Sequence, residues 1–399
     1  AAACRWRSTG EGTYTIEEID RKERGTRISF TLKKNAQEFA QKYRVREIIT
    51  KYSNFIDFPI YLQKEKVNTV SALWHRKTSD LKEGDVHDFY RFISHDPDEP
   101  LGYKHLSIEG SVNFRALIFI PKNAPQEPWK LQQEKSLHLY SNKILIQHDC
   151  KELLPEYLRF VKGIVDTTDL PLNVSREVTQ SSPVMVKIRN MLCAEIFAFL
   201  KEWSTKQEDL YKTFYAQFGR FLKAGLSMEF QHREKIIELL RFETSLKPAG
   251  TLVSLKDYVS RMPKDQKQIY FATGDSREIL ERSPNLEYFK KNNIEVLLLT
   301  DPVDVFAVPA LAEYDKKPIS SIEKADIELK PEEKLAKPDN ALSQSLIALF
   351  KVSLGDRVQD VVESKRLVDS PATLVTPKEG MDPQMEKMMK LMHQEYKSS

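Results

Sequence analysis

Apolar and polar residues alternate in several short runs of the chain, and this period is typical of β-strands. Elsewhere apolar residues recur every three or four positions, as on a helix with one buried face. In "VHDFYRFI" they fall at Val86, Phe89, Tyr90 and Ile93, which predicts a short helix. Helices are also predicted in residues 35–52, where Asn35 is the candidate cap, and over "LPEYLRFVKGIVD". The predicted strands are "TYTI", "TRISFTL", "FPIYL", "FRALIFI" and "LHLYSNKILIQ".

A long helix is predicted to begin at Ser182 and Pro183. Serine is a common capping residue, and proline fits the first helical turn because its missing N–H has no partner there. Two amphipathic helices follow, and the three are expected to pack together. "QIYFATG", "DSREILERS" and "IEVLLLT" then predict a strand, a helix and a second strand. The stripe on the long helix consists of Val184, Ile188, Leu192, Ile196, Phe199 and Trp203.

Strands placed between helices indicate layered α/β units, and 399 residues exceed one ordinary core. We therefore predict a multidomain α/β protein, α+β overall. Residues 1–55 would hold the tail of a larger first unit and a connecting helix, and residues 323–399 a junction and part of a last unit. Residues 56–322 would form the main domain: a large α/β unit (56–182), a three-helix spacer (183–250) and a small α/β unit (251–322).

Composition excludes several classes of function. The 61 basic and 58 acidic residues are interleaved and nearly cancel, whereas nucleic-acid binding needs a concentrated basic face. The three cysteines form no CxxC pair, which argues against a disulfide framework or a zinc site. No apolar run approaches the roughly 18 residues that cross a bilayer. Phosphate-binding loops, GxSxG elbows and HExxH motifs are absent from the sequence, and the eight histidines are scattered.

The stretch "DLPLNVSREVTQ" at residues 169–180 is the main candidate for chemistry. An apolar, proline-containing anchor leads directly to Arg176. This arginine can pair with a neighbouring carboxylate such as Glu177. It can also meet a phosphate, because a guanidinium offers forked donors and a permanent charge. Gln180 could add a neutral donor, and spacing alone leaves both interpretations open.

"KGIVDTTDLPLNVSRE" resembles the middle-domain signature of the 90-kDa heat-shock protein (HSP90) chaperones. Several other motifs match in the same order, so the similarity covers nearly the whole chain. We expect the mitochondrial branch, that of the tumour-necrosis-factor-receptor-associated member, because the long charged linker of cytosolic members is absent between Lys33 and Phe58. The expected location is the mitochondrial matrix, with the bacterial cytoplasm or another organelle as the alternative. The other matching motifs are "GTRISFTL", "VREIITKYSNFIDFPIYL", "IEGSVNFRALIFIPKNAP", "FGRFLKAG", "LLRFETS", "SLKDYVSRM" and "LGDRVQDVVESKRLVDSPATLV".

The resemblance implies an ATP-dependent chaperone with ATP and Mg²⁺ as cofactors. It implies that residues 1–55 end the α/β nucleotide-binding domain, that residues 56–322 are the middle domain, and that residues 323–399 are part of the α+β dimerisation domain. It implies that Arg176 contacts the ATP γ-phosphate held by the adjacent domain, that Gln180 supports this contact, and that Asn173 belongs to the same loop. The ATP pocket itself would lie in a part of the first domain that this chain lacks. We therefore expect the chain alone neither to bind nor to hydrolyse ATP. The alternative is a non-enzymatic scaffold or assembly subunit that has lost its ATPase domain.

Client proteins are the expected partners, together with a second copy of the chain, since the family forms homodimers through helices expected beyond Ser399. Trp129, in a polar loop, either folds back on its own domain or belongs to the exposed amphipathic loop that resembling proteins use for clients. A methionine stripe near the end of the chain suits a core, a dimer interface or promiscuous client binding. It consists of Met381, Met385, Met388, Met389 and Met392.

Overall fold

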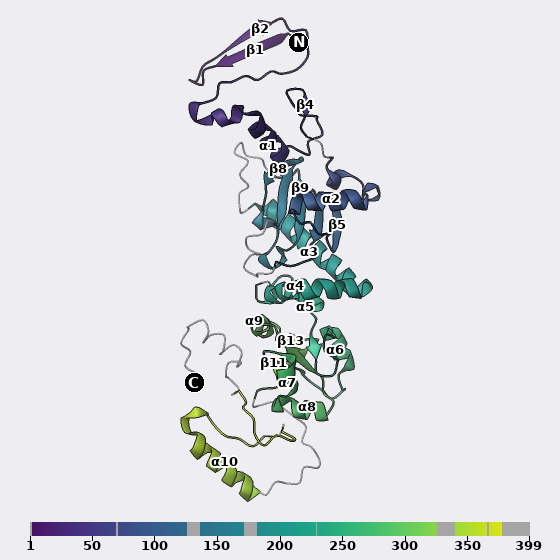
Figure 1. The fold of residues 1–399 in the computed structure, drawn as a ribbon, viewed down its shortest axis with the longest axis vertical. Helices are drawn as coiled ribbons and strands as arrows, with labels where there is room; N and C mark the ends of the chain where they lie inside the picture. Colours follow the sequence, from purple (N-terminus) through teal and green to yellow (C-terminus); the bar gives the residue numbers. More distant parts are fainter. Residues whose placement is uncertain are drawn as a thin grey trace. The chain divides into compact units, whose positions relative to one another are not determined.

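The computed structural model describes residues 2–68, 71–125, 136–170, 182–228, 230–324, 340–364 and 367–376 (Figure 1). The chain divides into two units, Ala1–Ser71 and Ala72–Ser399. The first unit contains an antiparallel hairpin of β1 (Ala3–Ser8) and β2 (Tyr14–Ile19). The hairpin is followed by η1 (Lys34–Ala40), α1 (Lys42–Tyr52), β3 (Tyr61–Leu62) and β4 (Glu65–Lys66).

Three expectations for the first unit need correction. "TRISFTL" is not a strand: no described segment pairs with it, and Ile28 and Phe30 are exposed. A strand is stable only when its N–H and C=O groups find partners, so alternation alone was insufficient. Asn35 does not cap the helix, because a 3₁₀ segment comes first and α1 begins after Gln41. Of "FPIYL", only the last two residues form a strand.

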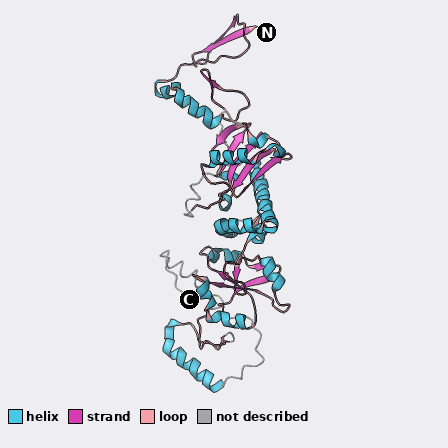
Figure 2. Cartoon of the chain, turned by 45° about the vertical axis from the view of Figure 1, so that its right-hand side comes forward, coloured by secondary structure: helices cyan, strands magenta, loops and turns pink. Residues whose placement is uncertain are grey.

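The second unit contains a five-stranded sheet, whose strands are magenta in Figure 2. The order of the strands is β5-β6-β9-β7-β8. Its pairs are antiparallel except β7 with β9, which run parallel. Between β7 and β8, Asn142 and Lys143 both have positive φ, as in a tight hairpin turn. The strands are β5 (Gly102–Ile108), β6 (Phe114–Ile120), β7 (Leu137–Ser141), β8 (Ile144–Gln147) and β9 (Lys162–Thr167).

Both faces of this sheet are covered, which explains why β6 is apolar almost throughout. On one face Phe119 lies against Phe89 and Tyr90 of α2 (Glu83–Ser94), with ring centroids 6.4 and 5.2 Å away. On the other face Ile118 belongs to the core that is shared with the long helices. Residues 72–170 and the following helices therefore form the expected α/β/α layers.

The helix predicted over "LPEYLRFVKGIVD" is wrong. The chain forms a single 3₁₀ turn, η6 (Glu156–Leu158), and then β9. Gly163 has φ +140°, and a Cβ there would lie 2.3 Å from the carbonyl oxygen of Leu117 on β6. Both the close approach to β6 and the positive φ require glycine at this position. The segment forms a strand because its backbone N–H and C=O groups can pair with β6 on one side and β7 on the other.

The three-helix layer is confirmed as α3 (Pro183–Lys206), α4 (Glu208–Met228) and α5 (Arg233–Leu239). Ser182 is the N-cap residue and Pro183 lies in the first turn, as predicted, although the serine hydroxyl makes no capping hydrogen bond. In the predicted stripe Val184 and Phe199 are half-buried. The other four members, Ile188, Leu192, Ile196 and Trp203, are buried.

A second five-stranded sheet, of order β10-β12-β11-β14-β13, follows the helices. The predicted strand, helix and strand are confirmed as β11, α7 and β12. Near the end of the described residues lie α10 (Asn340–Leu354) and η8 (Gly355–Arg357). The elements of this part are β10 (Glu243–Thr244), α6 (Leu255–Arg261), β11 (Ile269–Thr273), α7 (Arg277–Glu281), α8 (Glu287–Lys291), β12 (Val296–Leu299), α9 (Asp304–Ala310), β13 (Glu313–Tyr314) and β14 (Lys317–Ser321).

The mixed α/β fold class is thereby confirmed. The domain boundaries at residues 55, 182, 250 and 322 stay predictions.

Candidate functional site

The candidate phosphate-contacting loop lies outside the described residues, with Asn173, Arg176 and Gln180. Trp129 and the stripe of Met381, Met385, Met388, Met389 and Met392 also lie outside them. The structure does describe the two segments that flank the loop, the end of β9 and the start of α3.

The segment before the loop is fixed by Asp169. Its Oδ2 accepts hydrogen bonds from the backbone N–H of Asn113 at 2.7 Å and from the amide Nδ2 of the same residue at 3.1 Å. These donors, the backbone N–H first, lower the pKa of Asp169 below its ordinary value. Thr167 Oγ1 donates to the Asn113 carbonyl at 2.7 Å, and the side chain of Leu170 is buried in the core. The loop therefore leaves from a well-anchored position.

The segment after the loop is fixed by packing. Val184 lies against the main core, and Met185 and Ile188 are buried within it. Burying side chains of this size stabilises the start of α3 by roughly 1.5–3 kcal/mol each. The 11 residues between Leu170 and Ser182 thus connect two fixed ends.

Asp166 lies beside this anchor and was missed by sequence reasoning. Its Oδ2 accepts from Trp74 Nε1 at 2.8 Å, from the backbone N–H of Lys143 at 3.1 Å and from His75 Nε2 at 2.9 Å. Arg115 Nη1 donates to the other imidazole nitrogen, Nδ1, at 2.9 Å, so the proton of His75 lies on Nε2. Asp166 therefore joins the segment before α2, the β7–β8 turn and β9.

The available signal for Asp166 is an acidic residue at the end of an apolar run, but the spacing of that run predicts a helix and not the strand β9. A carboxylate whose side chain is only 3% exposed has lost most of its contact with water, so hydrogen-bond donors of the protein must replace the water. Here these donors come from distant parts of the sequence.

Across the described segments, no group of three or more His, Cys, Asp and Glu side chains could hold a metal ion. None of the helices in the described part of the chain is both long and apolar enough to pass through a membrane.

The chain belongs to the Hsp90 protein family, whose model matches residues 63–399. A chaperone protein HtpG from Chlorobium luteolum is 54% identical over 98% of the chain, and one from Chlorobaculum tepidum is 51% identical over 98%. One from Geobacter sulfurreducens is 39% identical over 99% of the chain. The chain spans 63% of the length of the first two relatives and 65% of the third.

These relatives are bacterial, so they support the family and not the expected mitochondrial branch. The match to the Chlorobium luteolum relative spans 396 residues and covers 98% of the chain, which leaves no room for a long insertion between Lys33 and Phe58 in that bacterial protein. The short connection therefore does not distinguish the mitochondrial branch from bacterial members.

Proposed function

We propose that the chain is part of a bacterial ATP-dependent chaperone of the HtpG type. The observation that carries this proposal is the 54% identity, over 98% of the chain, to a chaperone protein HtpG. The bacterial cytoplasm is the location that follows from this proposal.

The proposed role of Arg176 is to contact the ATP γ-phosphate in the adjacent nucleotide domain, with Asn173 and Gln180 in the same loop. The well-anchored flanks support this role. Asp169 and Leu170 fix one end of the loop, and Met185 fixes the other. Because both flanking segments are fixed before the nucleotide arrives, the loop has to rearrange little when it meets the phosphate. A guanidinium held in this way can stabilise the negative charge that develops on the phosphoryl group during transfer.

A chimera of the Chlorobium luteolum relative that carries this chain in place of its matched part would test the role of Arg176. We expect Arg176→Ala to lower ATP turnover on the order of 100-fold, because a charge-stabilising donor is lost. Arg176→Lys should recover only part of the rate, because an ammonium cannot form the forked contact. Lys187→Ala, at an exposed position of α3, is the control. Unchanged turnover in the Arg176→Ala chimera would contradict the proposed contact.

Client proteins and a second copy of the chain are the proposed partners. The candidate client-binding residues are Trp129 and the five-methionine stripe. We expect the purified 399-residue chain to slow aggregation of chemically denatured citrate synthase without ATP, and Trp129→Ser to weaken this effect. Trp6→Ser, at an exposed tryptophan of β1, is the control. Equal protection by both variants would exclude Trp129 from client binding.

A further inference from the structure

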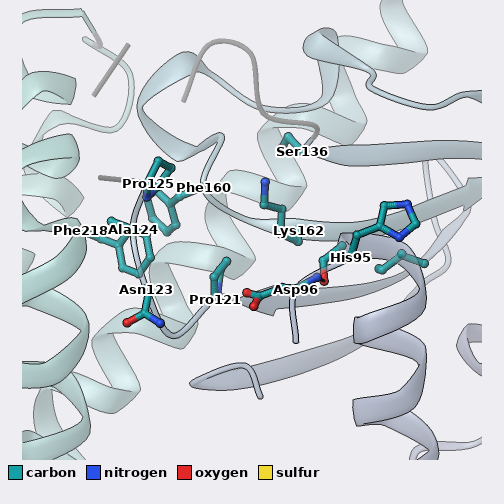
Figure 3. Close-up of a pocket in the computed structure, with 13 residues that line it drawn as sticks. His95, Asp96, Pro121, Asn123, Ala124, Pro125, Ser136, Phe160, Lys162 and Phe218 are labelled. Atoms are coloured by element: carbon teal, nitrogen blue, oxygen red, sulfur yellow. Dashed lines mark hydrogen bonds between the residues drawn. The ribbon is translucent and has the colours of Figure 1, made fainter. Parts of the chain in front are cut away.

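The two ends of β9 lie in different surroundings. Its first two residues, Lys162 and Gly163, line a cavity of about 430 Å³ beside the C-terminal end of α2 (Figure 3). Its last residue, Thr167, pairs with Phe114 at the start of β6, and this is the last pair between the two strands. The chain then continues through Asp169 to the candidate loop. The end at Thr167 therefore sets where the loop leaves the sheet.

Asn113, which directly precedes β6, continues the pairing beyond this last pair. Its backbone N–H donates to Asp169 Oδ2 at 2.7 Å, and its Nδ2 donates to the same oxygen at 3.1 Å. Its carbonyl accepts from Thr167 Oγ1 at 2.7 Å. Its Oδ1 accepts from the backbone N–H of Gly110 at 3.1 Å, within the turn between β5 and β6. Asn113 therefore uses both its main chain and its side chain to hold residues 167–169.

The contacts among Asn113, Thr167 and Asp169 form a closed ring. Thr167 Oγ1 donates to the Asn113 carbonyl and accepts from the backbone N–H of Asp169 at 3.2 Å, and Asp169 in turn accepts from Asn113. Each residue is both a donor and an acceptor, and hydrogen bonds linked in this way strengthen one another. Thr167 is only 1% exposed, so water competes little for its hydroxyl group.

The ring is supported by the protein interior. Val112 and Phe114, on either side of Asn113, are 1% and 2% exposed and belong to the main core. Leu170, which directly follows Asp169, is buried in the same core. The Asn113 side chain itself is exposed, so hydrogen bonds and not packing determine its contact with Asp169. A substitution that changes only these hydrogen bonds should therefore leave the fold intact.

We propose that Asn113 is a positioning residue for ATP hydrolysis. By holding Asp169, it fixes the point and the direction in which the chain leaves the sheet, seven positions before Arg176. The rate of phosphoryl transfer depends steeply on the placement of the groups that contact the phosphate, so a small displacement of this starting point slows turnover. Asn113 itself does not contact ATP. This inference rests on the proposed contact between Arg176 and the γ-phosphate.

The same chimera of the Chlorobium luteolum relative tests this role. Asn113→Asp keeps the size of the side chain and its contact with Gly110, but replaces the Nδ2 donor with an oxygen that repels Asp169. We expect kcat for ATP to fall about tenfold, as for one lost hydrogen bond to a charged group, with KM almost unchanged. The exchange Asn113→Asp/Asp169→Asn should restore most of the rate, because an amide and a carboxylate then face each other again.

Asn113 should act only through Arg176. Adding Asn113→Asp to Arg176→Ala should therefore cause no further loss of turnover, whereas two independent losses would multiply. Asn293→Asp, at an exposed position between α8 and β12, is the matched control and should keep the wild-type rate. Thermal unfolding of each variant reports whether the fold is retained.

The outcomes separate this inference from the proposed function. If Arg176→Ala slows turnover and a folded Asn113→Asp variant does not, the positioning role is wrong and the arginine contact stands. A further loss in the Arg176→Ala background, or no recovery in the exchange variant, would show that Asn113 acts through the fold and would also overturn the role. If Arg176→Ala leaves turnover unchanged, the arginine contact is wrong and the positioning role is wrong with it.

Discussion

The ammonium nitrogen of Lys223 on α4 lies 2.7 Å from Oδ1 of Asp304 on α9, and the two side chains are only 10% and 3% exposed. This ion pair joins the helical layer to the small α/β unit. Burial raises the pKa of Asp304, and the positive charge of Lys223 acts in the opposite direction. The carboxylate therefore depends on this lysine to remain ionised inside the protein.

Lys223→Met should lower the free energy of unfolding by about 3–5 kcal/mol, because it leaves a buried carboxylate without its counter-charge. The double variant Lys223→Met/Asp304→Leu should recover most of this loss, because apolar side chains avoid the desolvation cost of the charges. Urea unfolding of the single and double variants measures both effects.

The exposed pair of Lys212 and Asp209 is the control, and Lys212→Met should leave the free energy of unfolding almost unchanged, because solvent screens this pair. If Lys223→Met is as mild as Lys212→Met, the buried pair does not hold α4 and α9 together in the way inferred.

Glu287 on α8 binds a segment more than 80 residues further along the chain. Its Oε2 accepts from the backbone N–H groups of Val368, Asp369 and Ser370 at 2.9, 3.0 and 3.3 Å, and the Ser370 hydroxyl donates to Oε1. These donors, the Ser370 hydroxyl first, lower the pKa of Glu287 from 4.5 to about 2.

The folded-state pKa of Glu287 is depressed, so its stabilising contribution is present above pH 4.5 and is lost as the pH falls towards 2. Over that interval we expect the amides of residues 368–370 to lose protection in hydrogen-exchange measurements. Glu287→Gln should expose the same amides already at neutral pH, whereas Glu313→Gln, at an exposed position of β13, should not. Protection that is independent of both pH and Glu287 would rule out this contact.

Asp166 should be required for the order of the segment around Trp74. Asp166→Asn replaces a carboxylate that has three donors, so we expect a loss of about 2 kcal/mol in unfolding free energy. Changed fluorescence of the buried Trp74 should accompany this loss. Glu109→Gln removes a charge at an exposed position after β5 and should be neutral. Equal stability of the two variants would argue against Asp166 as a structural centre.

The sequence predicts the helices that carry long apolar stripes and the strands that are apolar on both faces, such as α3 and β6. Its errors occur where tertiary contacts override the local period. β9 looks helical by spacing, yet Gly163 and pairing with two strands make it a strand. "TRISFTL" has the strand period without a partner among the described residues.

The contacts of single polar residues were not predictable, because their partners are distant in sequence. Lys223 and Asp304 are 81 positions apart, and Trp74 and Asp166 are 92 apart. No local pattern connects such residues, since only the folded chain brings them together. The arginine of the candidate loop can be recognised in the sequence because the apolar run before it is local, and the structure describes the start of that run at Leu170.

The order of the first large sheet has a consequence for synthesis. β9 lies between β6 and β7, although both neighbours precede it in the chain. During translation these two strands emerge with unpaired edges, which are prone to association with other chains. The sheet closes only when residues 162–167 leave the ribosome, and the arginine loop is synthesised directly afterwards. A chain whose family includes chaperones therefore has two unpaired strand edges of its own until β9 has been made.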